Sequence, residues 1–319
     1  MPQSLRTLLF SVIALTLSSI PGFAQGVTSS TKNPQQVAAL HWYAANQTTT
    51  FSVGTFPGGI AWDGANLWVV SQVGNSVSKI RANDGATLGT FAVGNDPNNI
   101  AYDGANVWVS NFNDNTVSKL RGSDGTALGT FAVGIHPEGI AFDGASIWVA
   151  NSDGGNVSKL RASDGTLLGT FTTGQGPTHV IYDGANIWIT NTTAGTVTKL
   201  RGSNGALLGT FTVGGNPRGL AYDGVYVWIA CGITNNVFRL KASDGSLQGK
   251  FAVGNTPYGV TFDGANIWVV NFADATITKL SSTGASLGTF SVGGGPEETA
   301  FDGTYIWVVN VNDSTISKL

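Results

Sequence analysis

Two histidines and one glutamate stand close enough to recurring prolines to carry acid–base chemistry. His136 and Glu138 flank Pro137, and His179 follows Pro177 by two positions. An imidazole beside a carboxylate can act as general acid and general base, and the same groups can ligate a divalent metal. The sequence therefore offers His136, Glu138 and His179 as candidate catalytic residues, but it commits none of them to a reaction.

Other polar and aromatic residues that could form a site occupy the same kind of segment, a short loop around a proline. The candidate ligand-binding residues are Phe56, Asp96, His136, Glu138, His179, Arg218, Tyr258, Glu297 and Glu298. A residue that differs between repeat copies can occur only where the repeat tolerates it. This clustering is therefore expected of a plain scaffold as well as of a binding site, and both interpretations stay open.

The segments that position these residues belong to a repeat of forty residues. The motif Phe-x-(Val/Thr)-Gly begins at positions 51, 91, 131, 171, 211, 251 and 290. Each unit contains four short β-rich runs separated by turn residues, including a recurring Asp-Gly pair, and it shows no helical periodicity. This pattern predicts an all-β, seven-bladed β-propeller of four-stranded antiparallel blades.

Several repeated residues have a structural interpretation within this fold. The tryptophan of each second run predicts packing between blades. The lysines of the third runs, such as Lys79 and Lys159, are interpreted as a solvated stripe. Asparagines such as Asn151, which follow the second runs, suit hydrogen-bonded loop caps. Cys231 suits a small buried apolar position, because a single cysteine forms no internal disulfide.

The ends of the repeat region predict how the ring closes. The sequence stops after a third run, so the seventh unit lacks its outer strand. Residues 48–54 repeat the fourth-run pattern before any first run has occurred. We therefore expect this N-terminal strand to pair with the last blade and remove the open edge between the first and last blades.

The loops fall on two opposite sides of such a propeller. The proline loops and the loops after the tryptophan runs vary between copies, and both should open on one face. The Asp-Gly turns should lie on the other face, where the sequence is nearly the same in every blade. The variable face is therefore the predicted site of recognition. The face with the same sequence in every blade is a poor candidate.

Three stretches of the sequence carry a resemblance to a known family. Pro-x-Gly-Ile-Ala-Phe-Asp-Gly, Ile-Trp-Val-Ala-Asn and Thr-Val-Ser-Lys-Leu resemble YVTN-type β-propeller repeats, in the wider group that includes virginiamycin B lyase-like propellers. The resemblance covers residues 48–319 and implies the propeller fold. That group contains surface-layer, binding and lyase proteins, so the fold alone implies no activity.

The lyase members imply a specific comparison of site residues. Lyase-like repeats place a histidine directly after the proline and often a glutamate after the aromatic second strand. Here His136 precedes its proline, His179 comes one position late, and asparagines occupy the glutamate place. Because neighbouring strand residues point to opposite sides, a one-residue offset should turn the side chain away. Lyase chemistry is therefore not the first expectation.

Composition and the N-terminal residues limit the partners and the cellular location that we expect. A net charge of -3 with only 11% charged residues provides no basic surface for nucleic acid. Residues 1–24 resemble a signal peptide cleaved near Ala24, residues 25–47 form a polar lead, and residues 48–319 form the propeller. We expect a secreted or periplasmic monomer without a membrane span.

These observations predict an exported, non-catalytic propeller that binds a small molecule, a glycan or a protein through its variable loop face. The alternative is a lyase or hydrolase of the virginiamycin B lyase type, with a divalent metal as the one cofactor that the residues would hold. A second alternative is a structural protein of the cell envelope. No other cofactor is expected.

Overall fold

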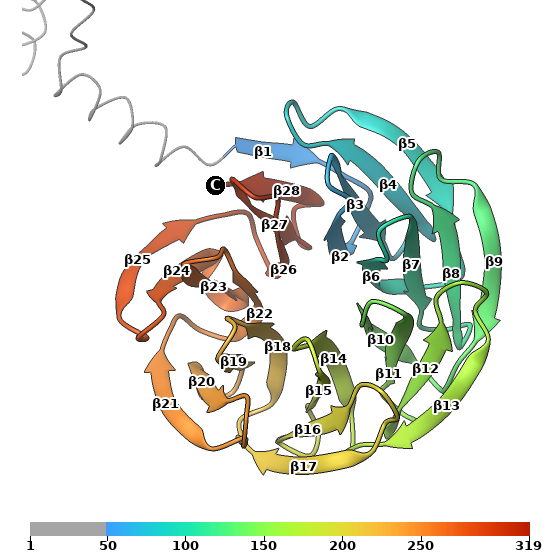
Figure 1. Ribbon diagram of the computed structural model, residues 1–319. Helices are drawn as coiled ribbons and strands as arrows, with labels where there is room; N and C mark the ends of the chain where they lie inside the picture. Colours follow the sequence, from blue (N-terminus) through green and yellow to red (C-terminus); the bar gives the residue numbers. More distant parts are fainter. Residues whose placement is uncertain (1–48) are drawn as a thin grey trace, which may run out of the picture. The chain divides into compact units, whose positions relative to one another are not determined.

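Each repeat folds into strands because short apolar runs alternate with turns that require a left-handed backbone. Gly64 ends the first hairpin of blade 1 with a φ of 94°, and Gly85 adopts a φ of 72° between the third and fourth strands. Glycine adopts these conformations without steric cost. The computed structural model describes residues 49–319, in which the repeats form seven four-stranded antiparallel sheets arranged around a central axis (Figure 1).

The predicted seven-bladed propeller is thus confirmed, and each blade runs from an inner to an outer strand. The strands of blades 1 to 3 are β2 Pro57–Trp62, β3 Asn66–Ser71, β4 Ser76–Arg81, β5 Thr87–Ala92, β6 Pro97–Tyr102, β7 Asn106–Asn111, β8 Thr116–Arg121, β9 Ala127–Ala132, β10 Pro137–Phe142, β11 Ser146–Asn151, β12 Asn156–Arg161 and β13 Leu167–Thr172.

Blades 4 to 6 repeat this order. Their strands are β14 Pro177–Tyr182, β15 Asn186–Asn191, β16 Thr196–Arg201, β17 Leu207–Thr212, β18 Pro217–Tyr222, β19 Tyr226–Cys231, β20 Asn236–Lys241, β21 Leu247–Ala252, β22 Pro257–Phe262, β23 Asn266–Asn271, β24 Thr276–Ser281 and β25 Ser286–Ser291. A short 3-10 helix, η1 Phe272–Asp274, follows β23.

Blade 7 closes the ring in the predicted way. It contains β26 Pro296–Phe301, β27 Ile306–Asn310 and β28 Thr315–Lys318, and β1 Thr49–Ser52 supplies its outer strand. The strands β1 and β28 are antiparallel, with Thr49 opposite Lys318 and Ser52 opposite Thr315. The expected signal peptide of residues 1–24 and the polar lead of residues 25–47 lie outside the described residues. Within residues 49–319, no helix is long and apolar enough to cross a membrane.

The core lies between neighbouring blades, where the repeated tryptophans are buried as predicted. Trp108 is fully buried and packs against Ile147 and Val149 of the next blade. Its indole N–H donates a 2.7 Å hydrogen bond to Asp103 of the Asp-Gly turn in its own blade. The turn aspartate therefore fixes the tryptophan ring against the neighbouring blade, and the same bond recurs in every copy.

The prediction of a solvated lysine stripe is wrong. Lys159 is only 8% exposed, and its Nζ donates to the carbonyl oxygen of Gly202 in the next blade at 2.6 Å. The ammonium also lies 4.7 Å from the centre of the Trp148 ring and 3.7 Å from Asp143. Trp148 and Lys159 are direct cross-strand partners, so the lysine shares the tryptophan's covered side of the sheet. A buried ammonium is tolerated there because it has charged and carbonyl partners.

Candidate functional site

The two variable loops of each blade lie on one face of the ring, as predicted. Asp96 of a proline loop accepts a backbone hydrogen bond from Phe112 at 3.0 Å, and His136 accepts one from Ser152 at 2.9 Å. We call this side the loop face. The Asp-Gly turns and the turns between third and fourth strands form the opposite side, which we call the turn face.

The first residues of every inner strand depart from regular strand geometry. In blade 3, Pro137 pairs with Asn151, but the register shifts before Ile140 pairs with Val149. The same irregularity occurs at the start of the inner strand in the other blades. Strict alternation of side chains therefore does not hold for the two residues that follow each proline.

His179 and Glu298 show the consequence, because they meet across the ring. His179 Nε2 lies 2.5 Å from Glu298 Oε1, which joins blade 4 to blade 7, and the two side chains are only 13% and 18% exposed. Burial alone would lower the pKa of His179, but the charge and hydrogen bond of Glu298 raise it above its ordinary value. The Nδ1 atom of His179 is buried without a hydrogen-bond partner.

Arg218 and Tyr258 form a second pair beside this one. Arg218 Nη1 donates to the Tyr258 hydroxyl at 2.9 Å, and Arg218 Nε donates to Asn216 Oδ1 at 2.8 Å. The Tyr258 ring also makes an edge contact with His179, with 5.9 Å between ring centres. Burial and the nearby Glu297 carboxylate raise the pKa of Tyr258 well above its ordinary value.

Two further glutamates belong to the same group. Burial raises the pKa of Glu138, although the charge of His179 and a hydrogen bond from Ser152 oppose the shift. Burial also raises the pKa of Glu297, against a hydrogen bond from Tyr258. We call the group of residues from five blades the central cluster; it consists of Glu138, His179, Arg218, Tyr258, Glu297 and Glu298.

The central cluster combines groups that could exchange protons and bind polar atoms. Its glutamates can accept hydrogen bonds or protons, and Arg218 and Tyr258 can donate hydrogen bonds. Within residues 49–319, no three His, Cys, Asp or Glu side chains are grouped so that they could hold a metal ion. The donors and acceptors of the cluster fit recognition of a polar ligand.

The remaining candidate residues lie in the loops around the cluster. Phe56 is 47% exposed, and Phe56, Asp96 and His136 all have a left-handed backbone with φ between 51° and 52°. His136 Nδ1 lies 2.7 Å from Asp153 Oδ2, and its ring stacks on Phe112 with 4.3 Å between centres. The structure therefore gives the two candidate catalytic histidines different partners: His136 pairs with Asp153, whereas His179 pairs with Glu298.

Sequence reasoning missed the residues that support these loops, including Asp153 and Phe112 as partners of His136. The sequence did carry a sign that the second position after each proline is crowded, because that residue is glycine in most blades. At Gly139 an added Cβ would come within 2.3 Å of the Thr178 carbonyl oxygen, so the repeat favours glycine there. His179 and Glu298 replace this glycine in their own blades.

Two of the structural predictions near the site are confirmed. Asn151 accepts a hydrogen bond from the Gly134 backbone at 3.1 Å and donates to Ser158 at 2.9 Å, so it caps the loop as expected. Cys231 is fully buried, and burial raises the pKa of its thiol to about 12. Neither residue is available for chemistry on the loop face.

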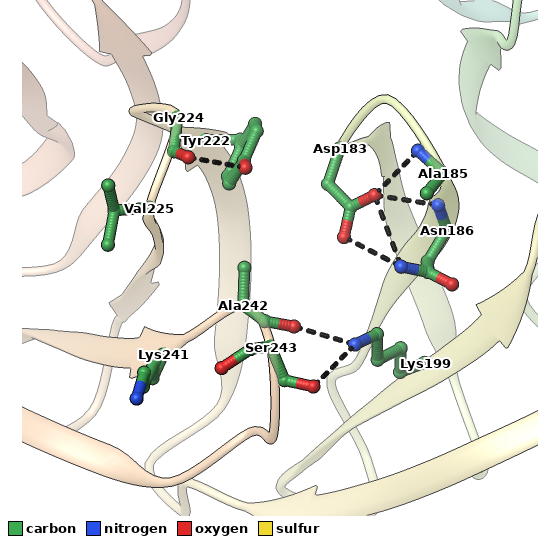
Figure 2. Close-up of a pocket in the computed structure, with 10 residues that line it drawn as sticks. All are labelled: Asp183, Ala185, Asn186, Lys199, Tyr222, Gly224, Val225, Lys241, Ala242 and Ser243. Atoms are coloured by element: carbon green, nitrogen blue, oxygen red, sulfur yellow. Dashed lines mark hydrogen bonds between the residues drawn. The ribbon is translucent and has the colours of Figure 1, made fainter.

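The structure contains cavities on both faces. On the loop face, one of about 410 Å³ lies between blades 5 and 6, and another of about 550 Å³ between blades 1 and 2. On the turn face, a cavity of about 400 Å³ lies between blades 4 and 5. Figure 2 shows that Lys199 donates to Ala242 and Ser243 in it, and that Asp183 accepts from Ala185 and Asn186. The turn-face cavity is therefore lined largely by groups that already bind one another.

Comparisons with known proteins agree on the fold. No protein-family model and no curated protein sequence matches the chain. A streptogramin B lyase structure matches with a TM-score of 0.74 and 18% identity, covering 85% of this chain and 96% of that one. Virginiamycin B lyase from Staphylococcus aureus matches with a TM-score of 0.75 and 18% identity, covering 85% and 98%.

Hydrazine synthase from Kuenenia stuttgartiensis matches equally well, with a TM-score of 0.75 and 19% identity over 93% of this chain and 99% of that one. Proteins with such different names share this architecture, so the likeness concerns the scaffold and not the chemistry. The chain therefore has the seven-bladed propeller fold found in virginiamycin B lyase and in other propellers.

Proposed function

We propose that this protein is an exported, non-catalytic propeller that binds a small ligand with a cationic group at the central cluster of its loop face. The observation that carries the proposal is the convergence of six polar side chains from five blades on one place. His179 and Glu298 bond across the ring, and Arg218 and Tyr258 bond beside them. None of these side chains is part of the repeat, so the scaffold alone does not require them.

The charge of the loop face supports a cationic ligand. Arg218 is the permanent cation of the central cluster, and the histidines of the loop face pair with carboxylates. The carboxylates of the face are Asp96, Asp114, Glu138, Asp153, Asp274, Glu297, Glu298 and Asp313. A ligand ammonium group would offset the buried charge of Glu138 and Glu297, whose raised pKa values show that ionisation is costly there.

The test compares two sugars that differ by one amino group, glucosamine and glucose, by calorimetry with residues 25–319. Glucosamine should bind and raise the melting temperature, whereas glucose should bind at least tenfold more weakly. The His179→Ala, Glu298→Gln double variant should lose glucosamine binding. A matched control on the turn face, Asp84→Asn, should keep it. Equal response to both sugars, or binding that survives in the double variant, would contradict the proposal.

A second candidate function has one observation in its favour, the buried pair of His179 and Glu298. A histidine held by a carboxylate can act as a general base, which a lyase or hydrolase of the virginiamycin B lyase type would need. Cleavage of virginiamycin B, abolished by His179→Ala with the fold intact, would support this alternative over simple binding.

A further inference from the structure

One loop-face cavity lies at a place where the other blades carry a side chain and its own blade does not. The residue that follows the second strand is Gln72, Phe112, Ser152, Thr192, Gly232, Phe272 or Val311 in the seven blades. Gly232 of blade 5 is therefore the position without a side chain, and it lines the cavity of about 410 Å³ between blades 5 and 6. We call this cavity the Gly232 pocket.

Blade 2 shows what fills the corresponding space elsewhere. Phe112 and Gly232 hold equivalent places, since each donates its backbone N–H to the preceding proline loop, to Asp96 and to Asn216 respectively. The Phe112 ring stacks flat on His136 of the next blade, with only 5° between the ring planes. In blade 5 the equivalent neighbour is Thr256, which lines the open pocket.

The glycine is not required by its own backbone. No left-handed φ is found at Gly232, and an added Cβ would meet its nearest neighbour, the Pro257 carbonyl oxygen, at an ordinary 3.6 Å. Several other loop glycines would clash with a Cβ, such as Gly215, where Thr234 would lie 2.7 Å away. The space at Gly232 is therefore left open by the sequence and not imposed by the fold.

The lining of the Gly232 pocket indicates the chemistry of its ligand. The pocket is lined by Asn216, Arg218, Gly232, Ile233, Asn235, Asn255, Thr256, Pro257 and Tyr258. Ile233 is 75% exposed, and the lining contains a guanidinium but no carboxylate, in contrast to the acidic central cluster. Arg218 uses Nε and one Nη1 hydrogen for Asn216 and Tyr258, and within the described residues Nη2 remains for a ligand oxygen.

We infer that the Gly232 pocket binds a planar ring that carries a carbonyl or carboxylate oxygen at its edge. The ring takes the place that the Phe112 side chain takes in blade 2, and the oxygen accepts from Arg218. A volume of about 410 Å³ is within the range of small-molecule sites and can hold such a ring. The inference rests on the proposed binding role of the loop face, and it implies one ligand with a ring in this pocket and a cationic group at the central cluster.

The experiment measures the binding of four small probes to residues 25–319 by saturation-transfer NMR. Benzamide and benzoate combine a planar ring with an acceptor oxygen, toluene lacks the acceptor, and cyclohexanecarboxamide lacks the planar ring. Benzamide and benzoate should bind at least tenfold more tightly than the other two. Equal binding of all four probes, or binding of none, overturns the inference.

Variants locate the binding. Gly232→Phe fills the pocket from within and should weaken benzamide at least tenfold, whereas Gln72→Phe, at the equivalent position of blade 1, should leave it unchanged. Thermal unfolding checks that both variants fold. If Gly232→Phe does not fold, Arg218→Met keeps the cavity and should remove the preference for benzamide over toluene. Undiminished benzamide binding in Gly232→Phe, or an undiminished preference in Arg218→Met, overturns the inference.

The two proposals fail separately. Gly232→Phe should keep glucosamine binding, and the His179→Ala, Glu298→Gln variant should keep benzamide binding. If wild-type protein binds glucosamine but not benzamide, the ring inference is wrong and the proposed function stands. If it binds benzamide at this pocket but not glucosamine, the cationic ligand is wrong and the ring site stands.

Discussion

The turn face and the central cluster use carboxylates in opposite ways. On the turn face, burial alone would raise the pKa of Asp63, but bonds from Trp68, Asn66 and Ala65 and the charge of Lys79 outweigh it and lower the pKa. In the central cluster, burial raises the pKa of Glu138 above its ordinary value. The same fold thus favours the ionised form of Asp63 and disfavours the ionised form of Glu138.

This difference separates residues whose charge stabilises the folded propeller from residues whose charge lowers its stability. Asp63 is bonded within its own blade and pairs with Lys79, so its negative charge contributes to folding. Glu138 and Glu297 are buried with incomplete compensation, so their charges oppose folding. Local costs of this kind are expected where a protein holds groups ready for a ligand.

The largest expected effect follows from removing a buried tryptophan. Trp148→Ala should lower the free energy of unfolding by about 3–5 kcal/mol, because the fully buried ring fills the space between two blades. Phe112→Ala on the half-buried loop face should cost clearly less. Urea unfolding followed by circular dichroism measures both. Similar losses for the two variants would contradict the separation between blade packing and loop face.

A smaller effect is expected from the buried lysine of the same blade. Lys159→Met keeps most of the apolar volume but removes the ammonium, which leaves the Gly202 carbonyl and Asp143 without this partner. The expected loss is about 2–3 kcal/mol, the cost of a buried charged group losing its hydrogen-bond partner. The exposed Lys241, at 48% side-chain exposure, serves as control, and Lys241→Met should be nearly neutral. Equal stability of the two variants would indicate that the third-strand lysines are solvated after all.

The smallest effect concerns pH and has opposite signs in the two regions. A raised carboxyl pKa means that the folded state binds more protons than the unfolded state, so stability falls as pH rises from about 4.5 through the raised value. Glu138→Gln combined with Glu297→Gln should therefore melt at a higher temperature than wild type at pH 8, and the difference should vanish by pH 4.

Asp63→Asn provides the matched control for this pH dependence. The lowered pKa of Asp63 gives stability that is present above about 3.8 and is lost as pH falls through the lowered value. This variant should melt below wild type at pH 8, and the gap should narrow as the pH falls towards 3. Melting curves from pH 3 to 8 test both variants, and shifts of the same sign would contradict the comparison.

The sequence predicts the scaffold well because every blade repeats the same physical solution. Seven copies of the turn and tryptophan pattern indicate the blades, and the N-terminal fourth-strand pattern indicates the closure that β1 and β28 form. The lysines were misinterpreted because one charged residue per strand resembles a solvent-exposed position. Their register opposite the tryptophans was the available sign that both residues face the next blade.

The sequence indicated the loops that carry the central cluster, but not how its side chains are arranged. Six of the nine candidate residues lie together in the central cluster, whereas Phe56, Asp96 and His136 lie in the loops around it. Alternation predicts that His179 would turn away. The register shift after each proline removes that alternation, so a residue one position after a proline, Glu138, and one two positions after, His179, approach each other. A bulge of this kind depends on pairing with the neighbouring strand, which the loop sequence alone does not specify.

The strand that closes the ring has a consequence for the order of assembly. Blades 1 to 6 are each made from one continuous stretch of about forty residues, so their strands can pair while the rest of the chain is unstructured. Blade 7 must bring β1 and β28 together from opposite ends of the described chain, which costs more loop-closure entropy. We therefore expect this blade to form last and to open first, so that the central cluster, which includes Glu297 and Glu298 of blade 7, is complete only when the ring is.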